Sequence, residues 1–169
     1  PDTIIVSSIA ELLDDADIDL VVINTPVQLH FEHAKAAVLA GKHILVEKPF
    51  TVTSEEANEL NELAKASNVK LTVFQNRRYD RDFKAVKEIV EKEVIGKIHE
   101  VEIRFDRFRS NAGGKIHKEG LLPGSGTLYD LGAHLIDQTL QLFGTPEKIF
   151  ADLMTLRPDV ASDDYFELL

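Results

Sequence analysis

The sequence contains no cysteine among its 169 residues. Disulfide bonds and thiolate metal sites are therefore excluded. A chain without cysteine fits the reducing cytoplasm, so we expect a cytoplasmic protein. Long apolar runs are also missing, since the longest covers 36–40 and a membrane-spanning helix needs roughly 20 residues. Positive charge is scarce, because 19 Lys and Arg face 29 Asp and Glu and leave a net charge of −10. We expect neither membrane attachment nor nucleic-acid binding, because an acidic surface repels phosphate.

What remains is an ordinary globular composition, with 44% hydrophobic and 28% charged residues. This length allows one large domain or two small ones. Residues 3–6 have the pattern of a buried strand at the very start, and residues 165–169 stop on apolar, strand-like residues. We therefore expect a piece of a longer chain that is truncated at both ends.

The first half repeats a short apolar run, a polar turn and a helical pattern. The helix predicted from residue 27 ends at Gly41, and Thr53 with Glu56 predicts a capping box at the start of the next helix. The runs are rich in β-branched residues and suit parallel strands buried on both faces. These predicted strands cover 3–6, 20–23, 43–46 and 71–74.

The second half has a different character. Residues 100–106 alternate polar and apolar side chains, which predicts a strand with one wet face. An irregular stretch over 110–126 precedes a helix predicted over 128–143. Further strands are predicted over 149–156 and 164–169. The order of elements indicates an α/β half that ends near Phe74, followed by an α+β half with a mainly antiparallel sheet.

Three predicted strands end in polar clusters. In open α/β sheets ligands bind beyond the carboxyl ends of the strands, so these clusters are candidates for one binding rim. The alternative interpretation is that loops are solvated and that prolines simply stop the strands; the spacing alone favours it. The clusters are Asn24-Thr25-Pro26, Glu47-Lys48-Pro49 and Gln75-Asn76-Arg77-Arg78.

A fourth polar cluster lies on the helix predicted over 128–143. Asp130, His134, Asp137 and Gln141 fall on one stripe opposite the leucines. A carboxylate one turn before an imidazole can orient it as a general acid or base. The alternative is a surface ion pair, with Asp130 placed near the positive end of the helix dipole.

Other candidates are weaker. Gly124-Ser125-Gly126 lacks the preceding strand and the third glycine of a dinucleotide fingerprint. The six histidines show no metal-ligand spacing, so we expect no metal site. Lys115, His117 and Lys118 form a small basic patch that we expect to be solvated.

Taken together, the motifs resemble the Gfo/Idh/MocA family of oxidoreductases over the whole chain. The resemblance rests on the segments 24–30, 40–49, 76–79 and 124–134, and above all on Glu47-Lys48-Pro49 and the Asp130–His134 helix. The arginine-rich segment and Tyr129 are most similar to the scyllo-inositol dehydrogenase-like branch. The resemblance implies part of a Rossmann-type, doubly wound dinucleotide-binding domain over 1–75. It also implies part of an α+β substrate and oligomerisation domain over 76–169.

The resemblance also implies a function. Family members use NAD or NADP to transfer a hydride to or from a sugar or cyclitol (polyol), and homo-oligomers (dimers or tetramers) are expected. The implied catalytic residues from the two domains are Lys48, Asp130 and His134, with His134 taking the hydroxyl proton and Lys48 donating to the reacting oxygen. The implied cofactor-binding residues are Asn24, Thr25, Pro26, His30, Glu47, Lys48, Asn76 and Arg78.

One departure from the family pattern keeps a second interpretation open. The family's glycine-rich phosphate loop would precede residue 1, so we expect this chain by itself not to bind a dinucleotide tightly. The alternative to a dehydrogenase is therefore a catalytically inactive fragment or paralogue that serves as an assembly or sugar-binding module.

Overall fold

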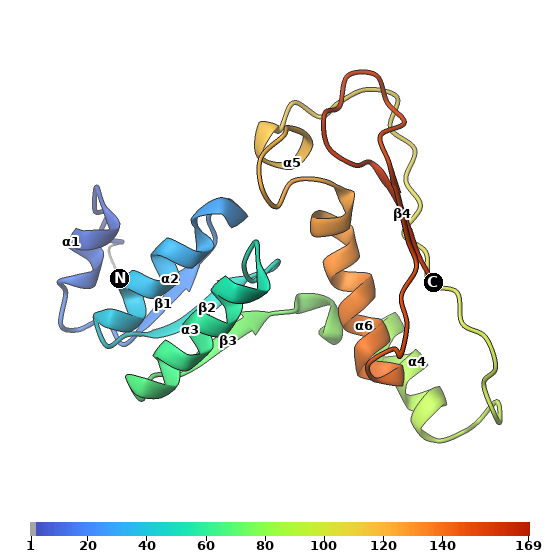
Figure 1. Ribbon diagram of the computed structural model, residues 1–169. Helices are drawn as coiled ribbons and strands as arrows, with labels where there is room; N and C mark the ends of the chain where they lie inside the picture. Colours follow the sequence, from blue (N-terminus) through green and yellow to red (C-terminus); the bar gives the residue numbers. More distant parts are fainter. Residues whose placement is uncertain (1–2) are drawn as a thin grey trace. The chain divides into compact units, whose positions relative to one another are not determined.

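The computed structural model describes residues 3–169 (Figure 1). The chain divides into two compact units, one up to Phe74 and one from Gln75 onward. Among the described residues, no helix combines the length and the apolar character needed to cross a bilayer.

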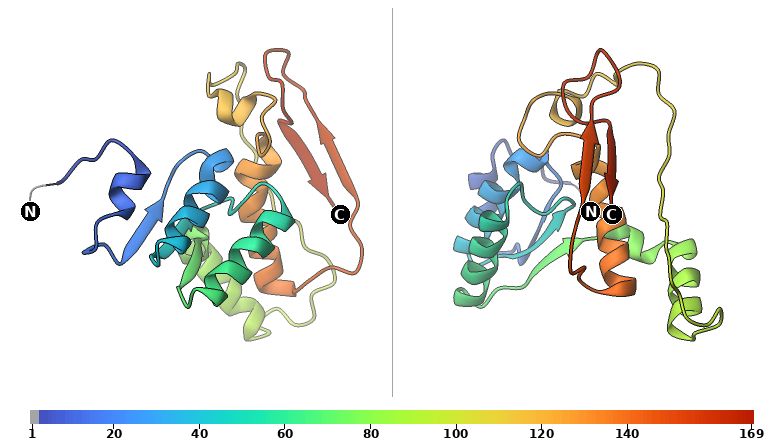
Figure 2. Two further views of the ribbon diagram at one scale, coloured as in Figure 1. Left: turned by 60° about the vertical axis from the view of Figure 1, so that its left-hand side comes forward. Right: turned by 45° about the vertical axis from the view of Figure 1, so that its right-hand side comes forward.

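The first unit is built on a parallel three-stranded sheet. Its strands follow the spatial order β1-β2-β3. Figure 2 gives two further views of the chain. Their carboxyl ends lie at the same edge, because Ile23 pairs with Val46 and Glu47 pairs with Phe74. The elements are α1 (Ile9–Leu13), β1 (Leu20–Ile23), η1 (Val27–Leu29), α2 (His30–Leu39), β2 (His43–Glu47), α3 (Ser54–Ala66) and β3 (Leu71–Phe74).

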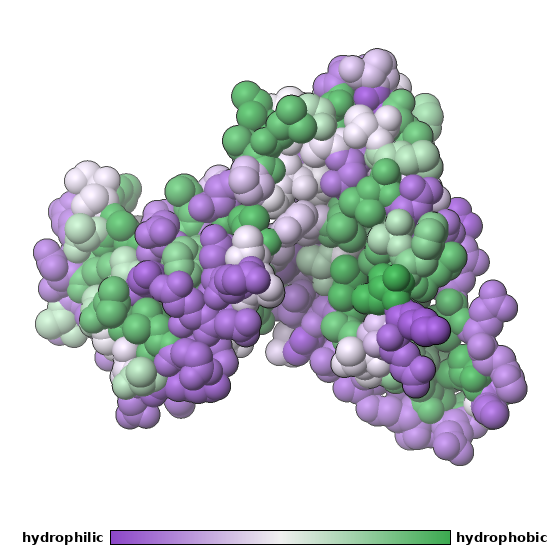
Figure 3. All heavy atoms as spheres, viewed as in Figure 1, coloured by the Kyte–Doolittle hydropathy of each residue, from purple (hydrophilic) through white to green (hydrophobic). Residues whose placement is uncertain are grey.

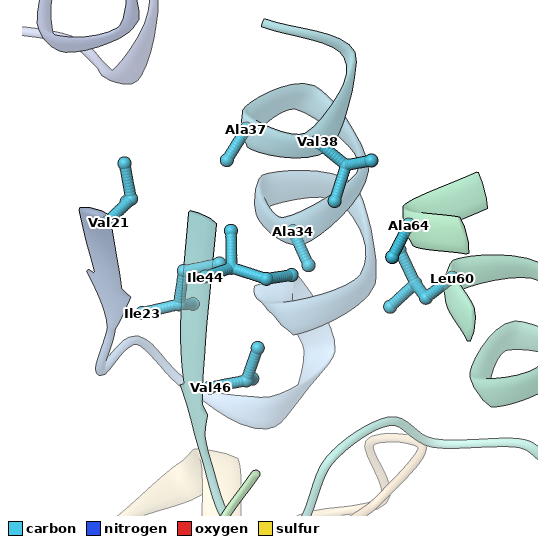
Figure 4. Packing of buried hydrophobic residues seen from close by; sticks show 9 residues of the cluster. All are labelled: Val21, Ile23, Ala34, Ala37, Val38, Ile44, Val46, Leu60 and Ala64. Carbon is cyan, nitrogen blue, oxygen red and sulfur yellow. The ribbon is translucent and has the colours of Figure 1, made fainter. Parts of the chain in front are cut away.

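The core of this unit lies between the sheet and the helices α2 and α3 (Figure 4). Its members are apolar side chains from β1, β2, α2 and α3: Val21, Ile23, Ala34, Ala37, Val38, Ile44, Val46, Leu60 and Ala64. On β1, Val21 and Ile23 are buried, whereas Leu20 and Val22 remain 53% and 59% exposed. Burial on both faces was therefore the wrong expectation for β1, because α2 and α3 cover only one face.

The predicted helix ends of the first unit are confirmed. Gly41 follows α2 with a φ of 74° and donates to Val38 O, while Lys42 donates to Ala37 O. This is the double hydrogen bond of a Schellman motif, and it satisfies the last carbonyls of the helix. At the start of α3, the Thr53 side chain and the Glu56 carboxylate each accept the other's backbone N–H.

The second unit combines helices with an antiparallel pair of strands, β4 and β5. Together with the parallel sheet of the first unit, this pair confirms the predicted fold class. The elements are η2 (Asn76–Tyr79), α4 (Arg81–Glu91), α5 (Ile116–Glu119), the π-helical turn η3 (Leu128–Gly132), α6 (Ala133–Phe143), β4 (Ala151–Met154) and β5 (Tyr165–Leu168).

Two predicted strands do not form. Residues 3–6 and residues 100–106 are irregular, although their side-chain patterns suit strands. A strand needs hydrogen bonds to a neighbour, and neither segment is paired within the sheets of the described residues. Ile4 and Ile5 are consequently more than 80% exposed.

The buried contact between α2 and α3 yields a stability prediction. Leu60 is fully buried, so Leu60→Ala should lower the free energy of unfolding by about 2–5 kcal/mol through lost burial and a residual cavity. Leu39→Ala, at an exposed position of α2, is the matched control and should cost less than about 0.5 kcal/mol. Urea unfolding measures both, and equal effects would contradict the packing described here.

Candidate active site

His30 connects two of the predicted strand-end clusters. Its imidazole is 1% exposed, and its Nδ1 lies 2.8 Å from Pro49 O. Its Nε2 lies 2.8 Å from Thr25 O, so the ring spans the loops that follow β1 and β2. The tautomer decides which nitrogen donates. Both ring nitrogens of His30 therefore face main-chain carbonyl oxygens, and the side chain holds the two loops in place.

The remaining strand-end residues of the first unit surround this bridge. The Glu47 carboxylate accepts the backbone N–H of Lys48 at 3.3 Å, which holds the turn after β2. Thr25 Oγ1 lies 3.4 Å from His33 Nδ1. Asn24 and Pro26 are exposed, while Lys48 is half-buried. The ends of β1 and β2 thus present amide, hydroxyl, carboxylate and ammonium groups at one edge of the sheet.

In the second unit, Asp130 and His134 lie at the junction of the π turn η3 and helix α6. His134 is only 5% exposed, so it is not a surface histidine. The π turn arises because Ala133 N donates to Leu128 O, five residues earlier. Such wide turns interrupt α-helices frequently at functional sites. The helix predicted over 128–143 is therefore present, but its first turn is widened where Asp130 lies.

Helix α6 buries polar side chains. Asp137 accepts two parallel hydrogen bonds from the Arg78 guanidinium, with Nε 2.8 Å from Oδ2. This fork raises the pKa of Arg78 above its ordinary value, chiefly through the hydrogen bond to Asp137. Gln138 Nε2 donates to Arg77 O at 3.3 Å. Arg78 thus joins η2 to α6, and Asn76 beside it is exposed.

Lys118, which we expected to lie in a solvated basic patch, forms an ion pair with Asp130. Its ammonium Nζ lies 2.7 Å from Asp130 Oδ1. Both side chains line a cavity of about 1350 Å³ in the second unit. Twelve residues and an irregular segment separate the two in the sequence, so no periodic pattern could have revealed this ion pair.

The start of η3 is anchored by the loop between β4 and β5. The Asp163 carbonyl accepts the N–H of Thr127 at 2.9 Å, and its carboxylate accepts that of Leu128 at 2.8 Å. These bonds satisfy backbone donors at a helix start, as an N-cap would. Gly126 has a φ of 101°, and a Cβ there would lie 1.8 Å from Asp163 Oδ1. The close approach therefore requires glycine at position 126.

Arg157 reinforces the same loop. Its Nε donates to Asp164 Oδ2 at 2.8 Å, and its Nη1 lies 3.6 Å from Glu119 Oε1. Burial acts to raise the pKa of Asp164, but hydrogen bonds from Leu156 N and Arg157 outweigh it, so that this pKa lies below its ordinary value. The Glu119 pKa is also lowered, chiefly because Gly113 N donates to its carboxylate. Both carboxylates are thus ionised partners of Arg157 at neutral pH.

The strand ends of the first unit fit the nicotinamide half of a dinucleotide better than its phosphates. The Asn24 amide, the Thr25 hydroxyl and the Glu47 carboxylate are short donors and acceptors that suit a carboxamide or a ribose hydroxyl. Residues 3–169 contain no glycine-rich turn from a strand into a helix that could bind a pyrophosphate. The fit therefore concerns the polar edge at the ends of β1 and β2.

Comparison with known proteins decides the family. A family described as "Oxidoreductase family, NAD-binding Rossmann fold" matches residues 2–75, and the "GFO/IDH/MocA C-terminal domain" matches residues 83–169. The chain belongs to the Gfo/Idh/MocA oxidoreductase family. The resemblance inferred from the motifs is thereby confirmed.

Individual members of the Gfo/Idh/MocA family match over nearly the whole chain. The uncharacterised oxidoreductase YdgJ of Escherichia coli K12 is 46% identical over 169 residues, which is 100% of this chain and 49% of YdgJ. The scyllo-inositol 2-dehydrogenase (NADP(+)) IolW of Bacillus subtilis 168 is 40% identical over 99% of this chain and 47% of IolW. A solved NAD-binding protein from Listeria innocua has a TM-score of 0.88 at 36% identity, over 96% of this chain and 48% of that chain. The chain thus spans about half the length of the curated relatives that it matches.

The close approach at Gly126 yields a matched pair of substitutions. Gly126→Ala and Gly114→Ala both force alanine into a left-handed conformation, which costs about 1–2 kcal/mol. Only the Cβ at 126 meets another group, so Gly126→Ala should lose about 1–3 kcal/mol more in urea unfolding. Equal losses would show that Asp163 does not pack over Gly126.

The lowered pKa of Asp164 predicts a pH-dependent contribution to stability. A carboxyl whose pKa is lower in the folded state stabilises the fold at pH values above its pKa in the unfolded chain. This stabilisation is lost as the pH falls through the folded-state pKa. Asp164→Asn should therefore lower the free energy of unfolding at pH 7, and the difference from the unchanged protein should shrink below about pH 4. Urea unfolding across this range measures it. Asp17→Asn, at an exposed position, should show no such trend.

Proposed function

We propose that the protein is an NAD- or NADP-dependent oxidoreductase that transfers a hydride between the nicotinamide cofactor and a sugar or cyclitol. The observation that carries this proposal is the buried His134 four residues after Asp130, in a Gfo/Idh/MocA C-terminal domain. The similarity to a relative named scyllo-inositol 2-dehydrogenase (NADP(+)) supports a polyol as substrate.

We assign the proton chemistry to side chains of this chain. A ring nitrogen of His134 takes the hydroxyl proton during oxidation and returns it during reduction, which suits an imidazole near neutral pH. Asp130 orients His134 or holds a neighbouring hydroxyl of the polyol. The Lys48 ammonium donates to the reacting oxygen and stabilises the negative charge that develops on it.

The cofactor supplies the hydride acceptor or donor when it is bound. We propose that Asn24, Thr25, Pro26, Glu47 and Lys48 contact its nicotinamide side, together with Asn76. His30 serves this group by holding the loops after β1 and β2, since its ring nitrogens face Thr25 O and Pro49 O. Arg78 supports it through η2, because its guanidinium is bound by Asp137.

We further propose that residues 1–75 belong to the dinucleotide-binding domain and residues 76–169 to the substrate domain of a cytoplasmic homo-oligomer. Support for assembly comes from apolar side chains exposed on the second unit, including Ile149, Phe150 and Leu153. Figure 3 shows hydrophobic surface over the region of β4 and β5. Such patches are typical of surfaces that bind another protein.

The proposed roles predict a loss of turnover without a loss of folding. His134→Asn should lower kcat about 100- to 10,000-fold because the proton acceptor is gone. Lys48→Met should lower it about 100- to 1000-fold because the developing charge loses its donor. Steady-state assays of the full-length protein with scyllo-inositol and NADP, and circular dichroism for folding, measure both.

The matched control for Lys48→Met is Lys65→Met, on the exposed side of α3. Its kcat should equal that of the unchanged protein. Unchanged turnover in the Lys48 and His134 variants would refute the roles. A protein that binds polyol without any turnover would support the sugar-binding module instead.

A further inference from the structure

Asp130 has a second polar neighbour besides His134, because it forms an ion pair with Lys118. The Lys118–Asp130 ion pair leaves the two side chains 40% and 33% exposed, so solvent and small ligands reach both. Both line the cavity of about 1350 Å³, together with Thr127. An ammonium and a carboxylate therefore lie side by side where solvent reaches them.

The backbone that carries Lys118 is fixed at several points. Lys118 O accepts the N–H of Gly126 at 2.8 Å and the hydroxyl of Ser162 at 3.2 Å. The next carbonyl, Glu119 O, accepts the N–H of Ala161 at 3.0 Å. These hydrogen bonds hold the main chain at Lys118, so that mainly its side-chain torsions remain free.

The same loop from the β4–β5 connection positions Asp130 as well. Asp163 binds the N–H groups of Thr127 and Leu128, which begin the turn that carries Asp130. Asp130 N itself donates to Gly126 O at 3.0 Å. Both halves of the ion pair thus depend on one neighbouring segment, and their spacing is built into the fold of the second unit.

The chemistry of the pair suits one kind of group. An ammonium has three N–H donors, of which the contact with Asp130 takes one, and a carboxylate has about four lone-pair sites. A hydroxyl both donates and accepts, so its oxygen can accept a hydrogen bond from the Lys118 ammonium while its O–H donates one to the Asp130 carboxylate. The two charges offset each other, which favours a neutral hydroxyl over an anionic group.

Building on the proposed function, we propose that Lys118 is a specificity-determining residue of the polyol site. It binds a hydroxyl adjacent to the reacting carbon, and it does so jointly with Asp130. A substrate of this site therefore carries neighbouring hydroxyl groups, as a cyclitol does. No covalent step is assigned to Lys118.

The test compares Lys118→Met, which keeps the length and removes the donors, with Lys118→Arg, which keeps the charge. Lys118→Met should lower kcat/KM for scyllo-inositol about 10- to 100-fold, the effect of one charged hydrogen bond, and leave KM for NADP unchanged. Lys118→Arg should recover most of the loss. In the Asp130→Asn background, Lys118→Met should cost less than about threefold, because the shared hydroxyl contact is already broken.

A binding measurement without cofactor separates this inference from the proposed function. Saturating scyllo-inositol should raise the melting temperature of the unchanged protein and of Lys115→Met, a control from the same basic patch, but not of Lys118→Met. If the unchanged protein shows turnover and the shift, and Lys118→Met matches it in both, this inference is overturned and the proposed function stands. If the unchanged protein shows neither turnover nor shift, both are overturned.

Discussion

The imidazole of His30 is the contact on which the proposed cofactor edge depends. Parallel pairing brings the ends of β1 and β2 to one edge, but the residues beyond the last ladder hydrogen bond are not fixed by the sheet. His30 supplies the missing constraint, because its ring lies between Thr25 O and Pro49 O. Its burial at the start of α2 makes that bridge rigid. The same bridge restrains Lys48, because Lys48 directly precedes Pro49, whose carbonyl oxygen faces His30.

In the second unit, the carboxylate of Asp163 holds the backbone in place as His30 does in the first. Asp163 binds the first donors of η3, and Gly126 allows the close approach that this requires. Arg157, held by Asp164 and Glu119, ties the loop of Asp163 to α5. Polar groups that lie far apart in the sequence thus fix the backbone around Asp130. Preorganisation of this kind is what a catalytic group needs, since a misplaced side chain contributes little.

Local signals predicted local structure well. The strands at 20–23 and 71–74, the Schellman glycine Gly41 and the Thr53–Glu56 capping box were all read correctly, because each depends on neighbours in the sequence. Residues 3–6 and 100–106 were wrongly predicted as strands, since an apolar run or an alternating pattern indicates which side chains suit burial but not whether a partner strand pairs with them. Asp130 and His134 were predicted as site residues from their spacing and from the resemblance, and that role stays a prediction. Lys118 was missed because its ion pair crosses an irregular segment without period.

The π turn at the start of α6 has a consequence for how this segment tolerates change in length. A π turn holds one residue more than an α turn, so η3 carries a built-in insertion between Leu128 and Ala133. Removing one residue there would restore regular α-helical hydrogen bonds and could leave the helix intact. It would also rotate everything before the deletion by about 100° relative to His134. Asp130 would then face a different direction, so a shortened segment could keep a sound helix while separating the acid from the imidazole.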